Sequence, residues 1–156
     1  MASGVPTLGR RGDRGCDMSD LKATMTRVYE EVFNQGNFDA IDEVIADDFV
    51  EHESLPPEIP NGKEAPVAMA KMIRAGFPDF HVTVEDMLQD GDKVVARVRF
   101  AGTHRGEFMG IPPTDNAFDI PVIDIIEFRD GKAIAHWGVM DMAGMMEQLG
   151  LAGPPA

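Results

Sequence analysis

The spacing of hydrophobic residues changes near the middle of the chain. Between residues 19 and 76 the apolar positions recur every three or four residues, which is the spacing of amphipathic helices. Between residues 80 and 141 apolar and polar positions alternate, which is the spacing of strands. Helices followed by a run of long antiparallel strands predict an α+β fold, with the helices on one face of a curled sheet.

Three helices are predicted in the first half. The first begins at Ser19 or Asp20, either of which can cap a helix, and it ends at Gly36. Its apolar face consists of Leu21, Met25, Val28, Val32 and Phe33. A short second helix follows from Asp39, an extended piece covers residues 49–52, and a third helix covers residues 65–75.

The second half predicts four strands. Their expected bounds are residues 80–85, 94–104, 118–128 and 132–141, with tight turns at 90–92 and 129–131 and a short closing helix at 143–149. The domain is therefore expected to span residues 19–150. A flexible tail of residues 1–18, rich in Gly and Arg, precedes it, and a short tail of residues 151–156 follows.

Composition restricts the partners. The chain of 156 residues is long enough for one core, and its formal net charge of -13 argues against nucleic acid and anionic membranes as partners. No apolar run approaches the roughly 20 residues that span a bilayer, and the N-terminus has no apolar secretory segment. The single cysteine, Cys16, cannot form an internal disulfide, so we expect a cytoplasmic protein.

Three polar residues share the apolar face of the predicted sheet. His104 has the parity of Val98 and Phe100, and Asp124 lies among apolar residues of strand 118–128. A buried carboxylate is costly unless it is paired, so Asp124 requires a partner. His136 of the next strand is the candidate, and a carboxylate beside an imidazole is an arrangement suited to acid/base catalysis. The alternative is a structural hydrogen bond in the core.

The hairpin register decides which residue faces Asp124. A three-residue loop with Gly131 in the left-handed conformation pairs Asp124 with His136 and places Val122 opposite Gly138. A two-residue loop places Trp137 opposite Asp124 instead. We favour the first register because it also pairs Ile126 with Ile134, which are both apolar.

Other candidates for chemistry are weaker. His52, between Glu51 and Glu53, either rims the pocket or is solvated, and His81 has surface parity. No metal site is predicted, because the histidines lack an HxH or HExxH spacing. No glycine-rich phosphate loop or nucleophile elbow is present, so no cofactor is expected.

Strand 118–128 is apolar on both faces. One face consists of Phe118, Ile120, Val122, Ile126 and Phe128, and the other of Pro121, Ile123 and Ile125. Helices can cover only one face, so a second subunit is the simplest cover for the other. We therefore expect a homodimer or a higher homo-oligomer.

One motif resembles a known family. The string GTHRGEFMGIPPTD at residues 102–115, followed by DIIEF, DGK and HW, resembles the SnoaL-like polyketide cyclases, or ester cyclases, of the nuclear transport factor 2-like superfamily. The resemblance covers residues 19–150. It implies a cone-shaped, curled antiparallel sheet with helices on its concave face (an α+β barrel) around an apolar pocket, in dimers or tetramers. It also implies ring closure by intramolecular aldol condensation, without cofactor or metal.

The resemblance also assigns site residues. His104 matches the inward histidine of the family's GxHxG loop, and His136 matches a histidine of the last strand. Asp124 matches a pocket-facing polar position that is histidine in the characterised cyclases. The aspartate that serves as their acid/base falls on Gly138, so this chain departs from the family at its central catalytic position.

Three functions are therefore open. The first is a cofactor-independent enzyme for a hydrophobic carbonyl compound, in which Asp124 and His136 exchange protons and His104 donates to an oxyanion. The expected substrate-binding residues are Phe49, His52, Phe100, Val122, Gly138 and Met140. The second is a protein that binds a small apolar metabolite without reaction, which the glycine at 138 favours. The third is a dimeric interaction module whose cavity is filled by its own side chains.

Overall fold

The structure is a computed structural model, and it describes residues 18–151. Its first helix begins at Met18. Residues 1–17 of the predicted N-terminal tail and residues 152–156 at the other end lie outside the described residues. The same holds for the side chains of the expected caps, Ser19 and Asp20. The predicted domain limits therefore stay predictions.

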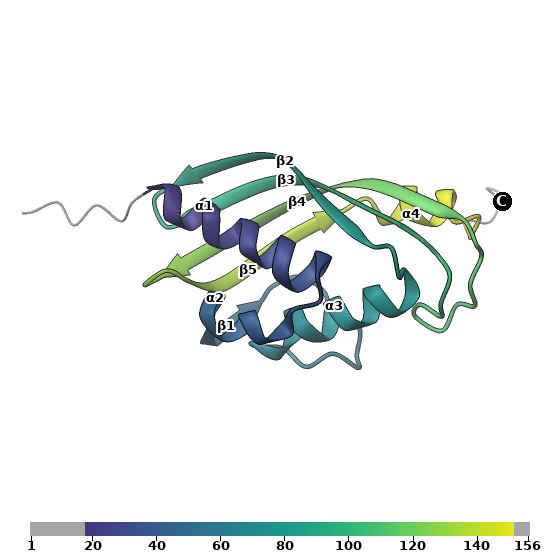
Figure 1. The fold of residues 1–156 in the computed structure, drawn as a ribbon, viewed down its shortest axis with the longest axis horizontal. Helices are drawn as coiled ribbons and strands as arrows, with labels where there is room; N and C mark the ends of the chain where they lie inside the picture. Colours follow the sequence, from purple (N-terminus) through teal and green to yellow (C-terminus); the bar gives the residue numbers. More distant parts are fainter. Residues whose placement is uncertain (1–17, 152–156) are drawn as a thin grey trace, which may run out of the picture.

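The helices occupy the first half of the described chain, as expected (Figure 1). They are α1 (Met18–Arg27), which continues into a π-helical segment η1 (Val28–Asn34), a 3-10 turn η2 (Phe38–Ala40), α2 (Ile41–Val44) and α3 (Glu64–Gly76). The first helix buries Leu21, Met25, Val28 and Val32, as their spacing predicts. It also buries Tyr29, which the predicted apolar face did not include.

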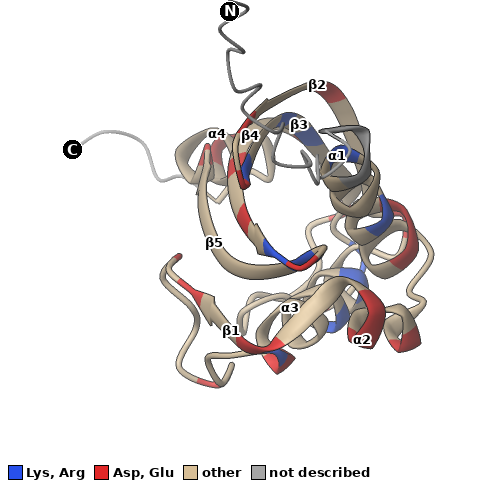
Figure 2. Ribbon diagram, turned by 90° about the vertical axis from the view of Figure 1, so that its left-hand side faces the viewer, with Lys and Arg blue, Asp and Glu red and all other residues tan. Residues whose placement is uncertain are grey.

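The strands lie close to their expected bounds, and those expected at 49–52, 80–85 and 118–128 are longer than expected. They are β1 (Ile45–Glu51), β2 (His81–Asp90), β3 (Lys93–Thr103), β4 (Ala117–Arg129) and β5 (Lys132–Met140), and the short helix α4 (Met142–Gln148) follows. Within the described chain they form one sheet in the order β1-β5-β4-β3-β2. The expectation of an α+β fold with helices on the concave face of a curled sheet is confirmed (Figures 1 and 2).

The sheet differs from the expected one at its β1 edge. β1 pairs with β5 in parallel, with Glu51 beside His136 in register, so the sheet is mixed rather than wholly antiparallel. The five strands curl without closing into a barrel over residues 18–151 (Figure 2). This edge matters for the site, because it adds a carboxylate that alternation in the later strands could not reveal.

The favoured three-residue register for β4 and β5 is wrong, and the two-residue alternative holds only at the turn. Asp130 and Gly131 have φ of 52° and 79°, so the hairpin has the two-residue turn in which both central residues have positive φ, with Arg129 paired to Lys132. A bulge between Phe128–Ala133 and Glu127–Ala135 then moves β5 by one further residue. Asp124 therefore lies opposite Gly138.

The bulge brings His136 back to the face of the sheet that bears Asp124. Asp124 and His136 still face the same side, but they are diagonal neighbours rather than a directly opposed pair, since His136 pairs with Ile126. Diagonal neighbours on one face remain within reach of long side chains. The two residues are therefore close together, as predicted, although the observed pairing of β4 with β5 differs from the predicted one.

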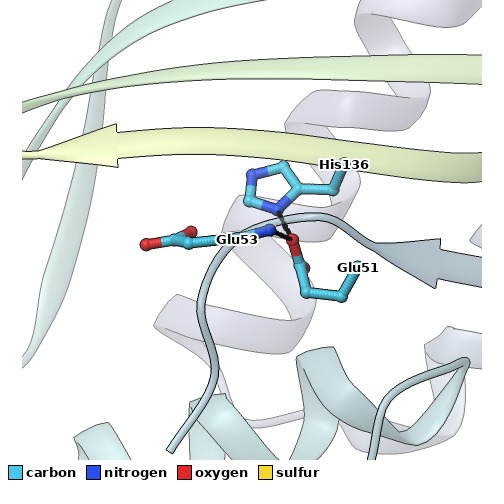
Figure 3. Close-up of side chains that lie close together, drawn as sticks. All are labelled: Glu51, Glu53 and His136. Atoms are coloured by element: carbon cyan, nitrogen blue, oxygen red, sulfur yellow. Dashed lines mark hydrogen bonds and ion pairs between the residues drawn. The ribbon is translucent and has the colours of Figure 1, made fainter.

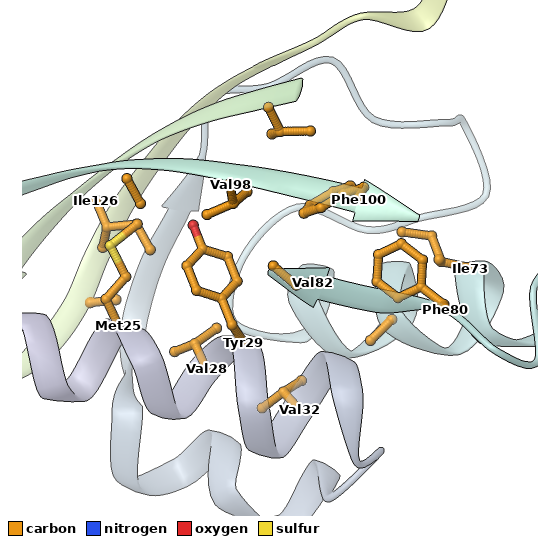
Figure 4. Packing of buried hydrophobic residues seen from close by; sticks show 14 of the residues in the cluster. Met25, Val28, Tyr29, Val32, Ile73, Phe80, Val82, Val98, Phe100 and Ile126 are labelled. Atoms are coloured by element: carbon orange, nitrogen blue, oxygen red, sulfur yellow. The ribbon is translucent and has the colours of Figure 1, made fainter. Parts of the chain in front are cut away.

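The core lies between the sheet and the helices. On β4 alternate residues are buried, including Phe118, Ile120, Val122 and Ile126, whereas Ile123 is 41% exposed on the outer face. Figure 4 shows Tyr29 extending from the helix among apolar residues toward the strands, with Val98 and Ile126 nearby. Within residues 18–151 no helix is both long and apolar enough to cross a membrane.

Candidate active site

The site is centred on the imidazole of His136. Its Nε2 lies 2.9 Å from Oδ1 of Asp124, and its Nδ1 lies 2.7 Å and 2.8 Å from the two carboxylate oxygens of Glu51. Asp124 and Glu51 are 5% and 9% exposed. Each ring nitrogen therefore faces a buried carboxylate, an arrangement that favours the doubly protonated ring. Figure 3 shows the contact of the ring with Glu51.

The pKa of His136 follows from these contacts. Burial alone would lower it, but the hydrogen bonds to Asp124 and Glu51 and the charges of both carboxylates outweigh burial and raise the pKa from 6.5 to about 10. At neutral pH the ring is an imidazolium that donates both N–H groups. Such a ring contributes a fixed positive charge and has no free nitrogen with which to take a proton.

The other end of Asp124 is held by a helix. The hydroxyl of Tyr29 donates to Oδ2 of Asp124 over 2.6 Å. Burial, followed by the negative charge of Asp124, raises the pKa of Tyr29 well above its usual value, so the phenol stays protonated. Both oxygens of Asp124 thus accept a hydrogen bond, one from a neutral phenol and one from a cation.

Glu51 is held in place by the side chain of Asn61 and by the backbone of Glu53. Its N–H donates to Oδ1 of Asn61 and its carbonyl accepts from Nδ2 of Asn61. Its Oε1 also accepts from the backbone N–H of Glu53 over 2.9 Å. The four residues Tyr29, Asp124, His136 and Glu51 form one hydrogen-bonded chain, which we call the acid cluster.

Glu53 is the remaining acidic residue at this place. Burial raises the pKa of its carboxyl group; the negative charges of Asp124 and Glu51 add to this and the positive charge of His136 opposes it. Within residues 18–151 its carboxylate accepts no hydrogen bond, in contrast to the carboxylates of Asp124 and Glu51. Figure 3 shows its side chain extending past His136, away from Glu51.

Gly138 leaves room for these groups. A Cβ placed on residue 138 would lie 2.7 Å from Oε2 of Glu53, 2.9 Å from Oδ1 of Asp124 and 2.9 Å from Cε1 of His136. All three distances are shorter than real Cβ contacts, so a side chain here requires the site to rearrange. The glycine is therefore explained by close approach: the carboxylate of Glu53 occupies the space beside β5.

Two adjoining pockets open onto these residues. The first, which we call the acid pocket, has a volume of about 80 Å³, and its polar residues are those of the acid cluster and Glu53. The second, about 300 Å³, is lined by six methionines, and we call it the methionine pocket. Its methionines are Met69, Met72, Met109, Met140, Met142 and Met145. Glu53, Leu55, Met69, Ile73, Phe100 and Met140 line both.

Most of the predicted pocket residues lie where they were expected. Phe49, Val122, Asp124 and His136 line the acid pocket, and Phe100 and Met140 line both pockets. The volume of the methionine pocket lies at the lower end of the range typical of small-molecule sites. The remaining lining is predominantly apolar, which suits a hydrophobic ligand with one polar end at the acid cluster.

Three predicted site residues line neither pocket: His52, His104 and Gly138. His52 points outward and stacks on Trp137, with ring centroids 4.6 Å apart and an interplanar angle of 3°. His104 is fully buried, as predicted, but its Nδ1 accepts from the backbone N–H of Thr114 and lies 3.1 Å from that residue's hydroxyl. The structure thus places His104 outside both pockets, with its ring bonded to Thr114 rather than to Asp124 or His136.

Three residues of the site were not identified from the sequence. Tyr29 lies four residues after Met25, so helical spacing placed it on the buried face. Glu51 and Glu53 share the parity of Phe49, which was assigned to the pocket, whereas His52 has the opposite parity. Helical spacing could therefore have identified Tyr29, and strand parity could have identified Glu51 and Glu53. The prediction named His52 of this segment instead.

Glu51, Glu53 and His136 also satisfy the spacing of a metal site, since one ligand atom of each lies within 4.8 Å of the others. The groups do not fit a metal well as arranged. Nδ1 of His136 is directed at the Glu51 carboxylate, and an imidazole whose pKa is raised to about 10 is protonated at neutral pH. A metal would have to displace that proton and the hydrogen bond.

The fold and the site define a class of protein: a curled α+β sheet that encloses an apolar pocket with buried acid/base groups at one end. Residues 23–149 match the model of the SnoaL-like polyketide cyclase family. The chain therefore belongs to this family.

Individual relatives agree. The chain is 31% identical to nogalonic acid methyl ester cyclase of Streptomyces nogalater over 119 residues, which is 76% of this chain and 89% of the relative. It is 29% identical to aklanonic acid methyl ester cyclase DauD of Streptomyces sp. (strain C5), over 81% of this chain and 80% of the relative. Among solved structures, TsrD from Streptomyces laurentii has a TM-score of 0.79 at 28% identity, covering 87% of this chain and 98% of that one.

Proposed function

We propose that this protein is a cofactor-independent cyclase that closes a ring in a hydrophobic, polyketide-like carbonyl compound by an aldol-type reaction. The observation that supports this most strongly is the acid cluster at one end of an apolar cavity, with a permanently charged imidazolium between two buried carboxylates. The apolar walls fold the substrate and exclude water, and the cluster supplies the charge that the reaction needs.

Asp124 and His136 have electrostatic roles in this proposal. An aldol reaction passes through an enolate and then an alkoxide, both anionic. The imidazolium of His136 lowers the free energy of these anions through its charge, because both of its N–H groups are already bonded within the protein. Asp124, held by Tyr29, keeps that ring protonated and in place.

Nogalonic acid methyl ester is the first substrate to test, because it appears in the name of a relative 31% identical to this chain. Asp124→Asn and His136→Ala should each lower turnover by roughly a hundredfold, since each removes a charge from the cluster. His81→Ala is the matched control, because His81 is exposed on β2. Undiminished turnover in both site variants would refute the roles given to the pair.

A second candidate function is binding without reaction. The observation that favours it is Gly138, which leaves β5 without a carboxylate at the position where the family resemblance places one. The same apolar pockets would then hold a metabolite with its polar end at the acid cluster. Recovery of the bound compound unchanged after long incubation supports this candidate over the cyclase.

We also propose that the protein forms a homodimer through the outer face of the sheet. Ile123 and Val139 face each other across β4 and β5, and they are 41% and 74% exposed. Pro121 on the same face of β4 is also exposed. An exposed apolar stretch of this kind is typical of an interface.

A further inference from the structure

We propose that Glu53 is the residue that exchanges protons with the substrate: its carboxylate takes the proton from carbon and later returns it to oxygen. This inference rests on the proposed cyclase function and adds a catalytic residue to it. Glu53 precedes the proline-rich loop after β1, and neither the sequence pattern nor the family resemblance assigned it a role.

The first support is availability. Asp124 accepts hydrogen bonds at both oxygens, from Tyr29 and from His136. Glu51 likewise accepts at both oxygens. A substrate proton taken up by either carboxylate would compete with hydrogen bonds that are already formed. The Glu53 carboxylate accepts no such bonds within the described chain, so it can be protonated without loss of a hydrogen bond.

The second support is position. Of the acidic residues at the site, Glu53 alone lines both the acid pocket and the methionine pocket. A substrate that occupies the methionine pocket and extends toward the acid cluster must pass Glu53. One ligand atom each of Glu53 and His136 lie within 4.8 Å of each other, so the reacting carbons of such a substrate lie beside both the carboxylate and the positive charge.

The third support is Gly138. The place that a side chain on residue 138 would occupy is flanked by Oε2 of Glu53 and Oδ1 of Asp124. Any larger residue would push Glu53 away, since its carboxylate is the movable end of a flexible side chain. The absence of a side chain at Gly138 therefore makes room for the carboxylate of Glu53, which follows β1 in the chain.

The reaction balances without a co-reactant. The ionised Glu53 removes a proton from the carbon between two carbonyl groups, and the electron pair of that C–H bond forms an enolate. The enolate carbon bonds to the carbon of a second carbonyl in the same molecule, and the π pair of that carbonyl moves to its oxygen. The alkoxide then takes the proton from the Glu53 carboxylic acid, which regenerates the carboxylate.

The environment of Glu53 suits this role. Burial raises its pKa, and a carboxylate with a raised pKa is a stronger base than an exposed one. The groups that face it are Glu51 on β1, Asp124 on β4 and His136 on β5, with Tyr29 behind Asp124. Of these only His136 is positive, so its charge opposes the rise of the Glu53 pKa.

Proton removal can be measured apart from ring closure. A naphthyl β-keto methyl ester has an acidic methylene group and an apolar body, but it has no second carbonyl placed for cyclisation. In deuterated buffer the wild-type protein should accelerate exchange of these methylene protons, followed by NMR. Glu53→Gln should slow the catalysed exchange roughly a hundredfold or more while binding of the ester is unchanged.

Glu58→Gln is the matched control, because Glu58 is an exposed glutamate in the same loop and should exchange at the wild-type rate. Formate added to Glu53→Ala should restore part of the exchange, which a merely structural role would not predict. Glu53→Gln exchange at the wild-type rate would overturn the inference.

The two proposals fail in different ways. Exchange that depends on Glu53 together with no ring closure of nogalonic acid methyl ester would leave the proton-transfer role intact and reject the cyclase function. Ring closure that persists in Glu53→Gln would do the reverse. A pH profile adds a third readout: the wild-type exchange rate should fall at low pH as Glu53 becomes protonated, and in Glu53→Ala with formate this fall should move to lower pH, because formate then carries the proton.

Discussion

At the scale of single residues, the site is a set of charges whose partners fix their protonation. His136 is held as a cation by Asp124 and Glu51, Tyr29 is held neutral, and Glu53 is left without a partner within the described chain. Sequence parity placed Asp124 and His136 on one face of the sheet, where they are in contact. It could not show that both nitrogens of the ring are occupied, because the parallel pairing of β1 with β5 brings Glu51 to the ring and is not visible in the alternation of the later strands.

The charge state of His136 has a consequence for stability. Its pKa is raised from 6.5 to about 10 in the folded protein, so folding is favoured by protonation of the ring. This stabilisation is fully present below pH 6.5 and is lost as the pH rises toward 10. We expect the free energy of unfolding to fall by on the order of a few kcal/mol over this range.

Urea denaturation at a series of pH values measures this effect, and His136→Gln is the reference, since it removes the titrating group. The fall should be much smaller in that variant. A pH dependence that is equal in the two proteins would contradict the imidazolium assignment.

At the scale of elements, the sequence predicts the order of helices and strands well, since each depends on local periodicity. The hairpin shows where such prediction stops. The Asp130-Gly131 pair specifies a two-residue turn, but the alternation of β4 and β5 does not show the bulge that follows it. The same limit explains why His104 was placed in the site, because parity gives a face of the sheet but no position along it.

His104 belongs instead to the loop after β3. Its backbone N–H donates to the carbonyl of Asn116 and its carbonyl accepts from the N–H of Asp115, while its Nδ1 bonds to Thr114. Its ring packs on Phe77, with centroids 5.2 Å apart. The histidine of the GxHxG string thus bonds to residues 114–116 and holds together the two ends of the loop between β3 and β4.

We therefore expect Thr114→Val to destabilise the fold by about 1–2 kcal/mol, because the hydroxyl contact to a buried imidazole is lost. Turnover at a temperature well below the unfolding midpoint should change little. Thr83→Val on β2 is the control, since Thr83 is exposed. Thermal denaturation measures the stability of both variants. A loss of turnover in Thr114→Val without a loss of stability would contradict the structural role of His104 and support a role in the reaction.

At the scale of the whole molecule, the sheet has one face against the helices and the pockets, while the other bears exposed apolar residues beside ion pairs such as Arg99–Asp119. The sequence showed that β4 is apolar on both sides, and the outer side is indeed uncovered within residues 18–151. What covers it is a property of an assembly, which the pattern of one chain suggests but does not determine.

The dimer proposal predicts a change in mass. Wild-type protein should have the mass of a dimer in light scattering at micromolar concentration, and Val139→Lys should shift it toward the monomer, because a charge would then be buried in the interface. Leu88→Lys is the comparison, as Leu88 is 64% exposed on the β2 edge of the sheet. A monomeric wild-type protein would contradict the proposal.

The most direct test of the cyclase proposal is the fate of one substrate. Protein freed of metal with EDTA is incubated with nogalonic acid methyl ester, and the mixture is analysed by chromatography and mass spectrometry. Aldol ring closure predicts a new compound of unchanged mass, formed by the wild-type protein and by His81→Ala but far more slowly by Asp124→Asn. Recovery of unchanged ester, or a product that has lost its methyl group, would contradict cofactor-independent cyclisation in this pocket.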